Sequence, residues 1–171
     1  MKQTNRRTFL KAAACAVAPR VLPSRLFGRQ APSTRIHVAM IGMGRQAFYS
    51  NLQPFLNADN VRVVAVCDVD RWRLENAKKK VDEHYHDSAC QVYTDWREVL
   101  DRDDVDAIMN STSDQWHVPI SLAAVRRGKH VSCEKPLTLS VAEGRVLADA
   151  VRQAGVTFRT DSECRSHAHM I

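Results

Sequence analysis

From residue 35 onward, the hydrophobic pattern alternates between short apolar runs and longer stretches in which apolar residues recur at helical spacing. Short runs rich in β-branched residues are typical of strands buried on both faces, whereas apolar residues three or four positions apart indicate amphipathic helices. The runs predict strands at residues 35–41, 61–67, 91–93, 105–109, 130–133 and 156–160. The stretches between them predict helices at residues 45–57, 70–85, 95–100, 115–127 and 140–154. This alternation predicts an α/β domain, a doubly wound parallel sheet with helices on both faces.

Local signals mark several helix boundaries. Gly128 and Gly155 follow two of the predicted helices, where glycine commonly ends a helix in the left-handed conformation. Ser140 and Glu143 have the spacing of a capping box, which starts the helix that Gly155 ends. In the charged helix at residues 70–85, the apolar positions expected to face the core are Trp72, Leu74, Ala77 and Val81.

A glycine-rich turn lies directly between the first predicted strand and the helix that follows it. Gly42, Gly44 and Ala47 form a G-x-G-x-x-A pattern there. The first glycine permits a tight turn, the second lets a pyrophosphate approach the backbone, and the small third residue keeps helix and strand in close contact. The pattern has an ordinary reading as a simple turn. In its strand–turn–helix context it predicts a Rossmann-type dinucleotide-binding domain.

An acidic residue follows the second predicted strand. Asp68 comes 26 residues after Gly42, where a carboxylate accepts hydrogen bonds from the adenosine ribose and repels a 2′-phosphate. The position favours NAD as the cofactor, with NADP less favoured. Arg71 and Arg73 lie close by and are of the type that accommodates a 2′-phosphate, and Asp68 has an alternative reading as a helix cap.

Glu134, Lys135 and Pro136 follow the fifth predicted strand, so they lie at the carboxyl edge of the sheet, where open α/β sheets bind ligands. A lysine there can hydrogen-bond a sugar hydroxyl and assist a proton transfer that accompanies hydride transfer. Pro136 disfavours helix at the preceding residue. Taken alone, the tripeptide is more typical of a surface salt bridge after a strand.

The positive charge of the chain is concentrated at its N-terminus. The formal net charge is +6, but residues 1–33 contain seven basic residues and no acidic one, leaving 18 basic and 19 acidic residues in the remainder. The body of the protein therefore offers no basic surface typical of nucleic-acid binding, and we expect no nucleic-acid partner.

The N-terminal segment has the pattern of a twin-arginine export signal. Arg6 and Arg7 are followed by a Phe-Leu-Lys sequence and a seven-residue apolar stretch, which is too short to span a bilayer. Twin-arginine export carries folded proteins, which suits an enzyme that must acquire a nucleotide cofactor before leaving the cytoplasm. We expect a signal and linker at residues 1–33, the export machinery as a partner, and a periplasmic or exported protein. The alternative is a disordered basic tail.

Cysteine and histidine spacings give little support to a disulfide framework or a metal centre. The chain has five cysteines, with no C-x-x-C pair, and Cys67 and Cys133 each end an apolar run, which predicts buried thiols. The pairs His84/His86 and His167/His169 have no cysteine or carboxylate nearby that would complete a ligand set. We therefore predict no metal site.

Five segments together resemble the Gfo/Idh/MocA family: IGMGRQA, VVAVCDVD, DAIMNSTSDQWHV, AVRRGKHVSCEKPLTLSVAEG and the run that ends in FRTDSECRS. The resemblance covers roughly residues 34–166 and is nearest to the bacterial branch exported by the twin-arginine pathway. It implies an NAD(P)-dependent oxidoreductase of sugars or sugar-like substrates, and some relatives couple the oxidation to cleavage of glycosidic bonds. The resemblance implies that Gly42, Gly44 and Asp68 hold the adenine-side phosphates and ribose of the cofactor. It implies that Ser111, Thr112 and His117 border the cofactor near the fourth strand. Glu134 and Lys135 would lie at the nicotinamide and substrate, with Lys135 as the catalytic lysine. His117 has an alternative role as a helix cap or packing group.

The family also has a second domain, mostly antiparallel sheet, which supplies the substrate pocket and usually an acid/base histidine. We expect residues 34–162 to form the dinucleotide-binding domain and residues 163–171 to begin the connection to a substrate domain that this chain lacks. His167 and His169 come too early in the sequence for the acid/base role. Two alternatives remain open: a non-catalytic nucleotide-binding remnant, and an interaction module that forms a homo-oligomer through apolar surface normally covered by the second domain.

Overall fold

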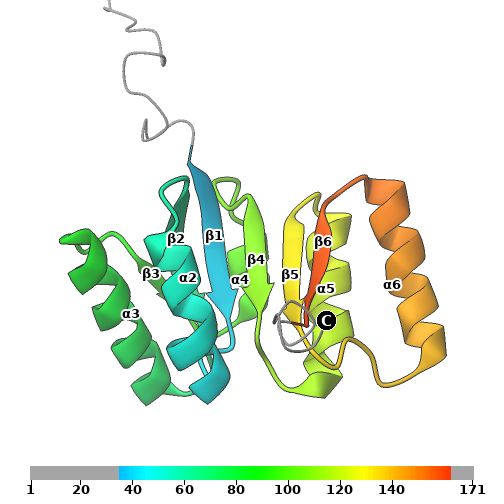
Figure 1. The fold of residues 1–171 in the computed structure, drawn as a ribbon, viewed down its shortest axis with the longest axis horizontal. Helices are drawn as coiled ribbons and strands as arrows, with labels where there is room; N and C mark the ends of the chain where they lie inside the picture. The colour runs from blue at the N-terminus through cyan, green and yellow to red at the C-terminus, as the bar shows by residue number, and fades with distance from the viewer. Residues whose placement is uncertain (1–34, 163–171) are drawn as a thin grey trace, which may run out of the picture.

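The computed structural model describes residues 35–162 and places six parallel strands in one sheet (Figure 1). The strands are β1 (Ile36–Ile41), β2 (Val61–Cys67), β3 (Gln91–Tyr93), β4 (Ala107–Asn110), β5 (His130–Glu134) and β6 (Phe158–Asp161). Their order across the sheet is β3-β2-β1-β4-β5-β6, the arrangement of a Rossmann fold. The predicted α/β class and its parallel sheet are confirmed.

Helices cover both faces of this sheet. They are α2 (Leu52–Asn57), α3 (Arg71–Tyr85), α4 (Trp96–Leu100), α5 (Asp114–Arg126) and α6 (Val141–Ala154). Alternate residues of β1 face opposite sides of the sheet. Val38 and Met40 belong to the core beneath α2 and α3, whereas Ala39 and Ile41 belong to the core beneath α4, α5 and α6. This two-sided burial explains why β1 and β2 are apolar at successive positions.

The predicted helix ends agree with the structure at three positions. Gly128 and Gly155 both have positive φ, +74° and +66°, and the Ser140 hydroxyl accepts a hydrogen bond from the Glu143 amide. The expectation for Trp72 is wrong, because its side chain is 71% exposed. The buried face of α3 is formed by Leu74, Ala77 and Val81, and Trp72 lies two residues before Leu74, on the opposite side of the helix.

The first helix departs from the predicted 45–57 segment in its opening turn. Ala47–Asn51 is π-helical, and α2 continues directly from it. A π-helical turn is rare and occurs often beside functional sites, because the extra residue changes the direction in which a side chain points. Here it directs Asn51 into the interior, where only 5% of the residue is exposed.

The strand order reverses between β1 and β4, which creates a crevice at the carboxyl edge of the sheet, the lower edge in Figure 1. Ile41 is paired with Cys67 on one side and with Asn110 on the other. The residues that follow these three positions, Gly42, Asp68 and Ser111, therefore lie at neighbouring strand ends. Within the part of the chain that the structure describes, no helix is long and apolar enough to cross a membrane.

Candidate functional site

The first glycine of the turn after β1 occupies a position that admits no side chain. Gly42 has φ +83°, and a Cβ atom there would lie 2.7 Å from the Ser111 carbonyl oxygen. Its amide donates to the Cys67 carbonyl at 2.8 Å, and the Ser111 amide donates to the Ile41 carbonyl at the same distance. The turn is thereby held against the ends of both neighbouring strands, and only glycine satisfies both the backbone angle and the close approach.

The second glycine and the third small residue of the turn have different surroundings. A Cβ atom on Gly44 would have only the guanidinium of Arg73 within 4 Å, at 3.9 Å, so the backbone faces open space. Ala47 is fully buried beneath the turn in the core shared with α2 and α3. An open backbone above a closely packed helix start is the arrangement that a pyrophosphate requires, so these residues fit a dinucleotide.

Asp68 joins the end of β2 to this turn. One carboxylate oxygen accepts a 2.6 Å hydrogen bond from the Met43 amide, and the other accepts from the Asp70 amide at 2.9 Å. The residue is only 8% exposed. Each carboxylate oxygen has a second lone pair, so Asp68 can also accept from ribose hydroxyls while it holds the turn. The carboxylate lies where the sequence predicts it.

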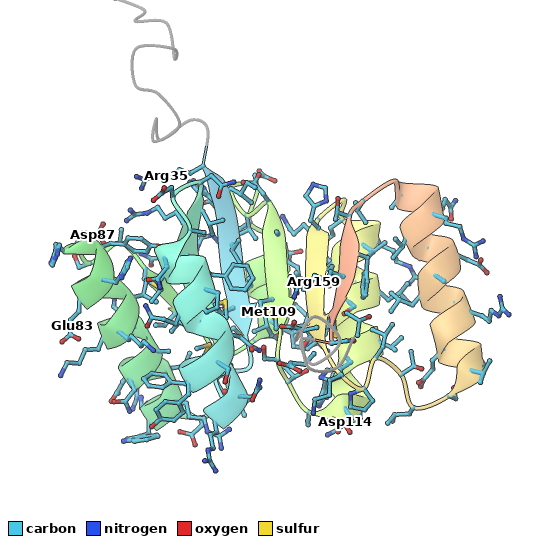
Figure 2. The ribbon with its side chains drawn as sticks, viewed as in Figure 1. Arg35, Glu83, Asp87, Met109, Asp114 and Arg159 are labelled. Carbon is cyan, nitrogen blue, oxygen red and sulfur yellow. The ribbon has the colours of Figure 1, made fainter. Side chains whose placement is uncertain are left out.

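These groups line one cleft, with a cavity volume of about 610 Å³. Its walls come from the glycine turn, the end of β2, the segment between β3 and α4, and the loop after β4. The predicted residues that line it are Gly42, Gly44, Asp68, Ser111 and Thr112. Basic and aromatic side chains also line it: Arg45, Arg73, Trp96, Arg97 and Trp116. The Arg97 guanidinium lies 4.4 Å from the ring centre of Trp96. Figure 2 shows Asp114, the first residue of α5, at this edge and Arg35 at the opposite one, beside a separate hollow of about 420 Å³.

The loop after β4 is fixed by a residue that the sequence analysis missed. Asn110 is fully buried, its side-chain oxygen accepts from the Thr112 hydroxyl at 2.7 Å, and its amide donates to the His117 carbonyl at 3.1 Å. His117 itself is 1% exposed, with its ring nitrogens 2.6 Å from the Pro136 carbonyl oxygen and 3.1 Å from that of Thr112. The structure thus places His117 beneath the cleft, tying the β4 loop to the β5 loop.

Glu134 and Lys135 lie beside the cleft rather than in its wall. Glu134 is 6% exposed, and its carboxylate accepts from the Asn51 amide at 2.8 Å and from the Lys135 backbone amide at 3.1 Å. The Lys135 side chain is exposed, and the bond to Pro136 is cis. Among the ion pairs within residues 35–162, none involves Lys135, so the salt-bridge reading of this tripeptide has no support there.

Asn51 is the second functional candidate that the sequence analysis missed. Its side-chain amide donates to Ser111 Oγ at 2.9 Å and to Glu134 Oε1 at 2.8 Å, which links the π-helical turn to the ends of β4 and β5. The sequence signals neither the inward direction of Asn51, which depends on the π-helical turn, nor its two partners, which are 60 and 83 residues away.

The described cysteines behave as predicted for buried thiols. Cys67 borders the cleft, and burial raises its pKa to about 12, while burial raises the pKa of Cys133 to about 11. Both are therefore thiols rather than thiolates at neutral pH, and they serve as small apolar groups. Residues 35–162 contain no grouping of three cysteine, histidine or acidic side chains suited to a metal ion; Cys15, Cys164, His167 and His169 lie outside the described residues.

Comparison with known proteins identifies the family. Residues 36–162 match the family model described as an oxidoreductase family with an NAD-binding Rossmann fold. The chain belongs to the Gfo/Idh/MocA family. This confirms the resemblance drawn from the glycine turn and the Glu-Lys-Pro segment, and with it membership in a family of NAD(P)-binding oxidoreductases.

Two relatives of this Gfo/Idh/MocA chain come from Shewanella. A glycosyl hydrolase family 109 protein 1 of Shewanella sp. strain ANA-3 is 30% identical over 188 residues, which cover 96% of this chain and 39% of that protein. An alpha-N-acetylgalactosaminidase of Shewanella oneidensis is 30% identical over 161 residues, covering 91% of this chain and 33% of that one. The chain thus spans well under half the length of these relatives.

Solved structures agree with the fold. A 3-ketoreductase from Actinomadura kijaniata, solved with NADP and TDP-benzene, superimposes with a TM-score of 0.70 at 25% identity, over 79% of this chain and 40% of that chain. A myo-inositol 2-dehydrogenase from Lactobacillus plantarum gives a TM-score of 0.69 at 26% identity, over 78% of this chain and 38% of that chain.

Proposed function

We propose that this chain is the cofactor-binding part of an NAD(P)-dependent oxidoreductase that acts on sugars or sugar-like molecules, with NAD preferred. The observation that carries the proposal is the meeting of the glycine turn, the buried Asp68 carboxylate and the Glu134–Lys135 pair at one edge of the sheet. A 3-ketoreductase and an inositol dehydrogenase among the similar structures support a polyhydroxylated substrate.

Different residues along the cleft bind different parts of the cofactor and substrate. The turn around Gly42 and Gly44 leaves backbone amides and the helix start facing the pyrophosphate, and Asp68 accepts from the adenosine ribose. A bound nicotinamide supplies a hydride acceptor. The exposed ammonium of Lys135 would donate a hydrogen bond to the oxygen of the carbinol being oxidised and stabilise its developing negative charge while the hydroxyl proton passes to water.

A second outcome, oxidation coupled to cleavage of a glycosidic bond, is favoured by the relatives described as glycosyl hydrolase family 109 and alpha-N-acetylgalactosaminidase. The two outcomes are separated by supplying NAD and a nitrophenyl α-N-acetylgalactosaminide to an enzyme in which this cofactor-binding part is joined to a substrate domain. Release of nitrophenol without net formation of NADH supports glycoside cleavage. Net NADH formation when a free sugar is supplied in place of the glycoside supports a simple dehydrogenase.

Calorimetric titration of the chain with NAD, NADP and ADP tests the cofactor function. We expect NAD to bind, and Asp68→Ala to weaken that binding, because a charged acceptor of the ribose hydroxyls is removed. Failure of all three nucleotides to bind would overturn the proposal and favour the alternative of a non-catalytic remnant.

We also propose that the chain is exported in folded form through the twin-arginine pathway, which places it in the periplasm or outside the cell. The support is the Arg6-Arg7 pattern, which lies outside the described residues. Residues 1–33 fused to a fluorescent protein that folds in the cytoplasm should carry it across the membrane, and Arg6→Lys with Arg7→Lys should block this. Equal export of both fusions would contradict the proposal.

Homo-oligomer formation is a further proposal, supported by exposed apolar side chains at the carboxyl edge. Val69 is 90% exposed and Trp72 is 71% exposed, and both flank the start of α3. Large exposed apolar side chains favour association. Light scattering after size-exclusion chromatography should give a mass above 19.3 kDa, and a monomer at millimolar concentration would count against association.

A further inference from the structure

Asn51 lies at the junction of three elements and joins them through its side-chain hydrogen bonds. The π-helical turn directs it inward, the loop after β4 contributes Ser111, and the end of β5 contributes Glu134. With 5% of Asn51 and 6% of Glu134 exposed, both groups are shielded from water. A buried polar network of this kind fixes the orientation of its side chains, because a buried group that turned away from its partner would be left without a hydrogen bond.

The hydrogen-bond polarity of this junction follows from the chemistry of the amide. The side-chain nitrogen of Asn51 has two hydrogens, and it uses one for Ser111 Oγ and the other for Glu134 Oε1. Ser111 therefore accepts from within the protein, which leaves its own hydrogen to donate toward the cleft that it lines. Glu134 is held as an acceptor, and its second oxygen receives the Lys135 backbone amide.

We propose that Asn51 is the positioning residue for the nicotinamide end of the site: it orients Ser111 as a donor and Glu134 as an acceptor, and through Glu134 it fixes the backbone from which Lys135 extends. This inference rests on the proposed function. A dinucleotide lies across the point where the strand order reverses, with its two halves on opposite sides. Because Asp68 follows β2, the adenosine half lies on that side, and the nicotinamide half extends over the ends of β4 and β5.

The two halves of the cofactor give the test an internal control. ADP fills only the adenosine side, which Asn51 does not contact, whereas NAD also reaches Ser111 and Glu134. Asn51→Ala should weaken NAD about tenfold, the effect of losing one hydrogen bond to a charged group, and should change ADP affinity less than twofold. A residue that only stabilised the fold would affect both nucleotides alike.

Asn57→Ala is the matched control. Asn57 is the last residue of α2, and its side-chain oxygen accepts a 2.9 Å hydrogen bond from the Gln53 amide. The substitution removes that one hydrogen bond and leaves the contacts of Asn51 with the strand ends in place. This variant should bind NAD and ADP as the unmodified chain does.

Exchanging donor and acceptor gives a second variant. Asn51→Asp places two carboxylates in contact and should weaken NAD more than Asn51→Ala does. Adding Glu134→Gln to Asn51→Asp removes the repulsion between the two carboxylates and rebuilds their contact with its polarity reversed. The new carboxylate also takes the hydrogen of Ser111, so NAD affinity should recover at least threefold over Asn51→Asp but stay below that of the unmodified chain, a pattern that reports direct coupling. Should the single variants fail to fold, recovery of a folded, NAD-binding double variant still supports the coupling.

Calorimetric titration of the unmodified chain and these variants with NAD and ADP decides the matter. A selective loss of NAD affinity, with recovery in the double variant, supports the inference. Equal losses for NAD and ADP, no loss at all, or no recovery in the double variant would overturn it while leaving the proposed function intact. Absence of any binding by the unmodified chain would overturn the proposed function and this inference together.

Discussion

The Asp68 carboxylate accepts a 2.6 Å hydrogen bond from the Met43 amide, so the acidic residue that follows β2 also holds the glycine turn that follows β1. The same carboxylate accepts from the Asp70 amide, one residue before α3. Asp68 thus joins two of the segments from which the cleft is built. Its proposed contact with ribose and its structural role depend on the same two oxygen atoms.

Replacement of Asp68 should therefore affect stability as well as cofactor affinity. Asp68→Ala leaves the Met43 amide without its acceptor and should lower the free energy of unfolding by about 1–3 kcal/mol. Asp70→Ala is the control: Asp70 caps α3 through the Arg73 amide, and its loss should cost about 1 kcal/mol without weakening NAD. Denaturant unfolding and calorimetric titration measure the two effects. An Asp68→Ala variant of unchanged stability would contradict the structural role.

The fold and the glycine-turn half of the candidate site could be predicted from the sequence, because both depend on local patterns along the chain. Buried parallel strands are apolar throughout, and the glycine turn and Asp68 lie at strand ends that any parallel sheet brings to one edge. The contacts of Asn51 depend on a π-helical turn and on partners distant in the sequence, so neither periodicity nor spacing reveals them. Trp72 was misplaced because a large apolar side chain was expected inside despite its position off the buried face of α3.

Gly42 and Gly155 provide a comparison between two kinds of constraint. Both have positive φ, but a Cβ on Gly155 would meet nothing within 4 Å, whereas a Cβ on Gly42 would lie 2.7 Å from backbone. Gly155→Ala should cost about 1–2 kcal/mol, the conformational penalty alone. Gly42→Ala should cost more and should abolish nucleotide binding, because the turn must move away from β4. Equal unfolding free energies for the two variants would contradict the close approach at Gly42.

Gly44→Ala should weaken nucleotide binding with little effect on stability, in contrast to Gly155→Ala. The position has ordinary backbone angles and open space, so the variant should fold with a stability within about 0.5 kcal/mol of the unmodified chain. The added methyl group enters the space assigned to the pyrophosphate and should weaken both NAD and ADP by tenfold or more, since both contain that group. Thermal unfolding and titration of the same sample separate the effects. Unchanged affinity for both nucleotides would place the pyrophosphate elsewhere.

Arg73 should determine how well NADP competes with NAD. Its guanidinium lies 3.9 Å from the position of a Cβ on Gly44 and lines the same cleft as Asp68, whereas Arg71 is 92% exposed and pairs with Glu75 outside the cleft. A 2′-phosphate brings negative charge next to Asp68, and Arg73 is the group placed to offset that repulsion.

Arg73→Ala should therefore weaken NADP about tenfold, equivalent to about 1.4 kcal/mol, and should change NAD affinity by less than twofold. Arg71→Ala should change neither, because its side chain is exposed to solvent outside the cleft. Competition between NADP and NAD in titrations at fixed salt measures the ratio directly. If Arg73→Ala weakened both nucleotides equally, the guanidinium would be acting on the pyrophosphate, and discrimination between the cofactors would rest on Asp68 alone.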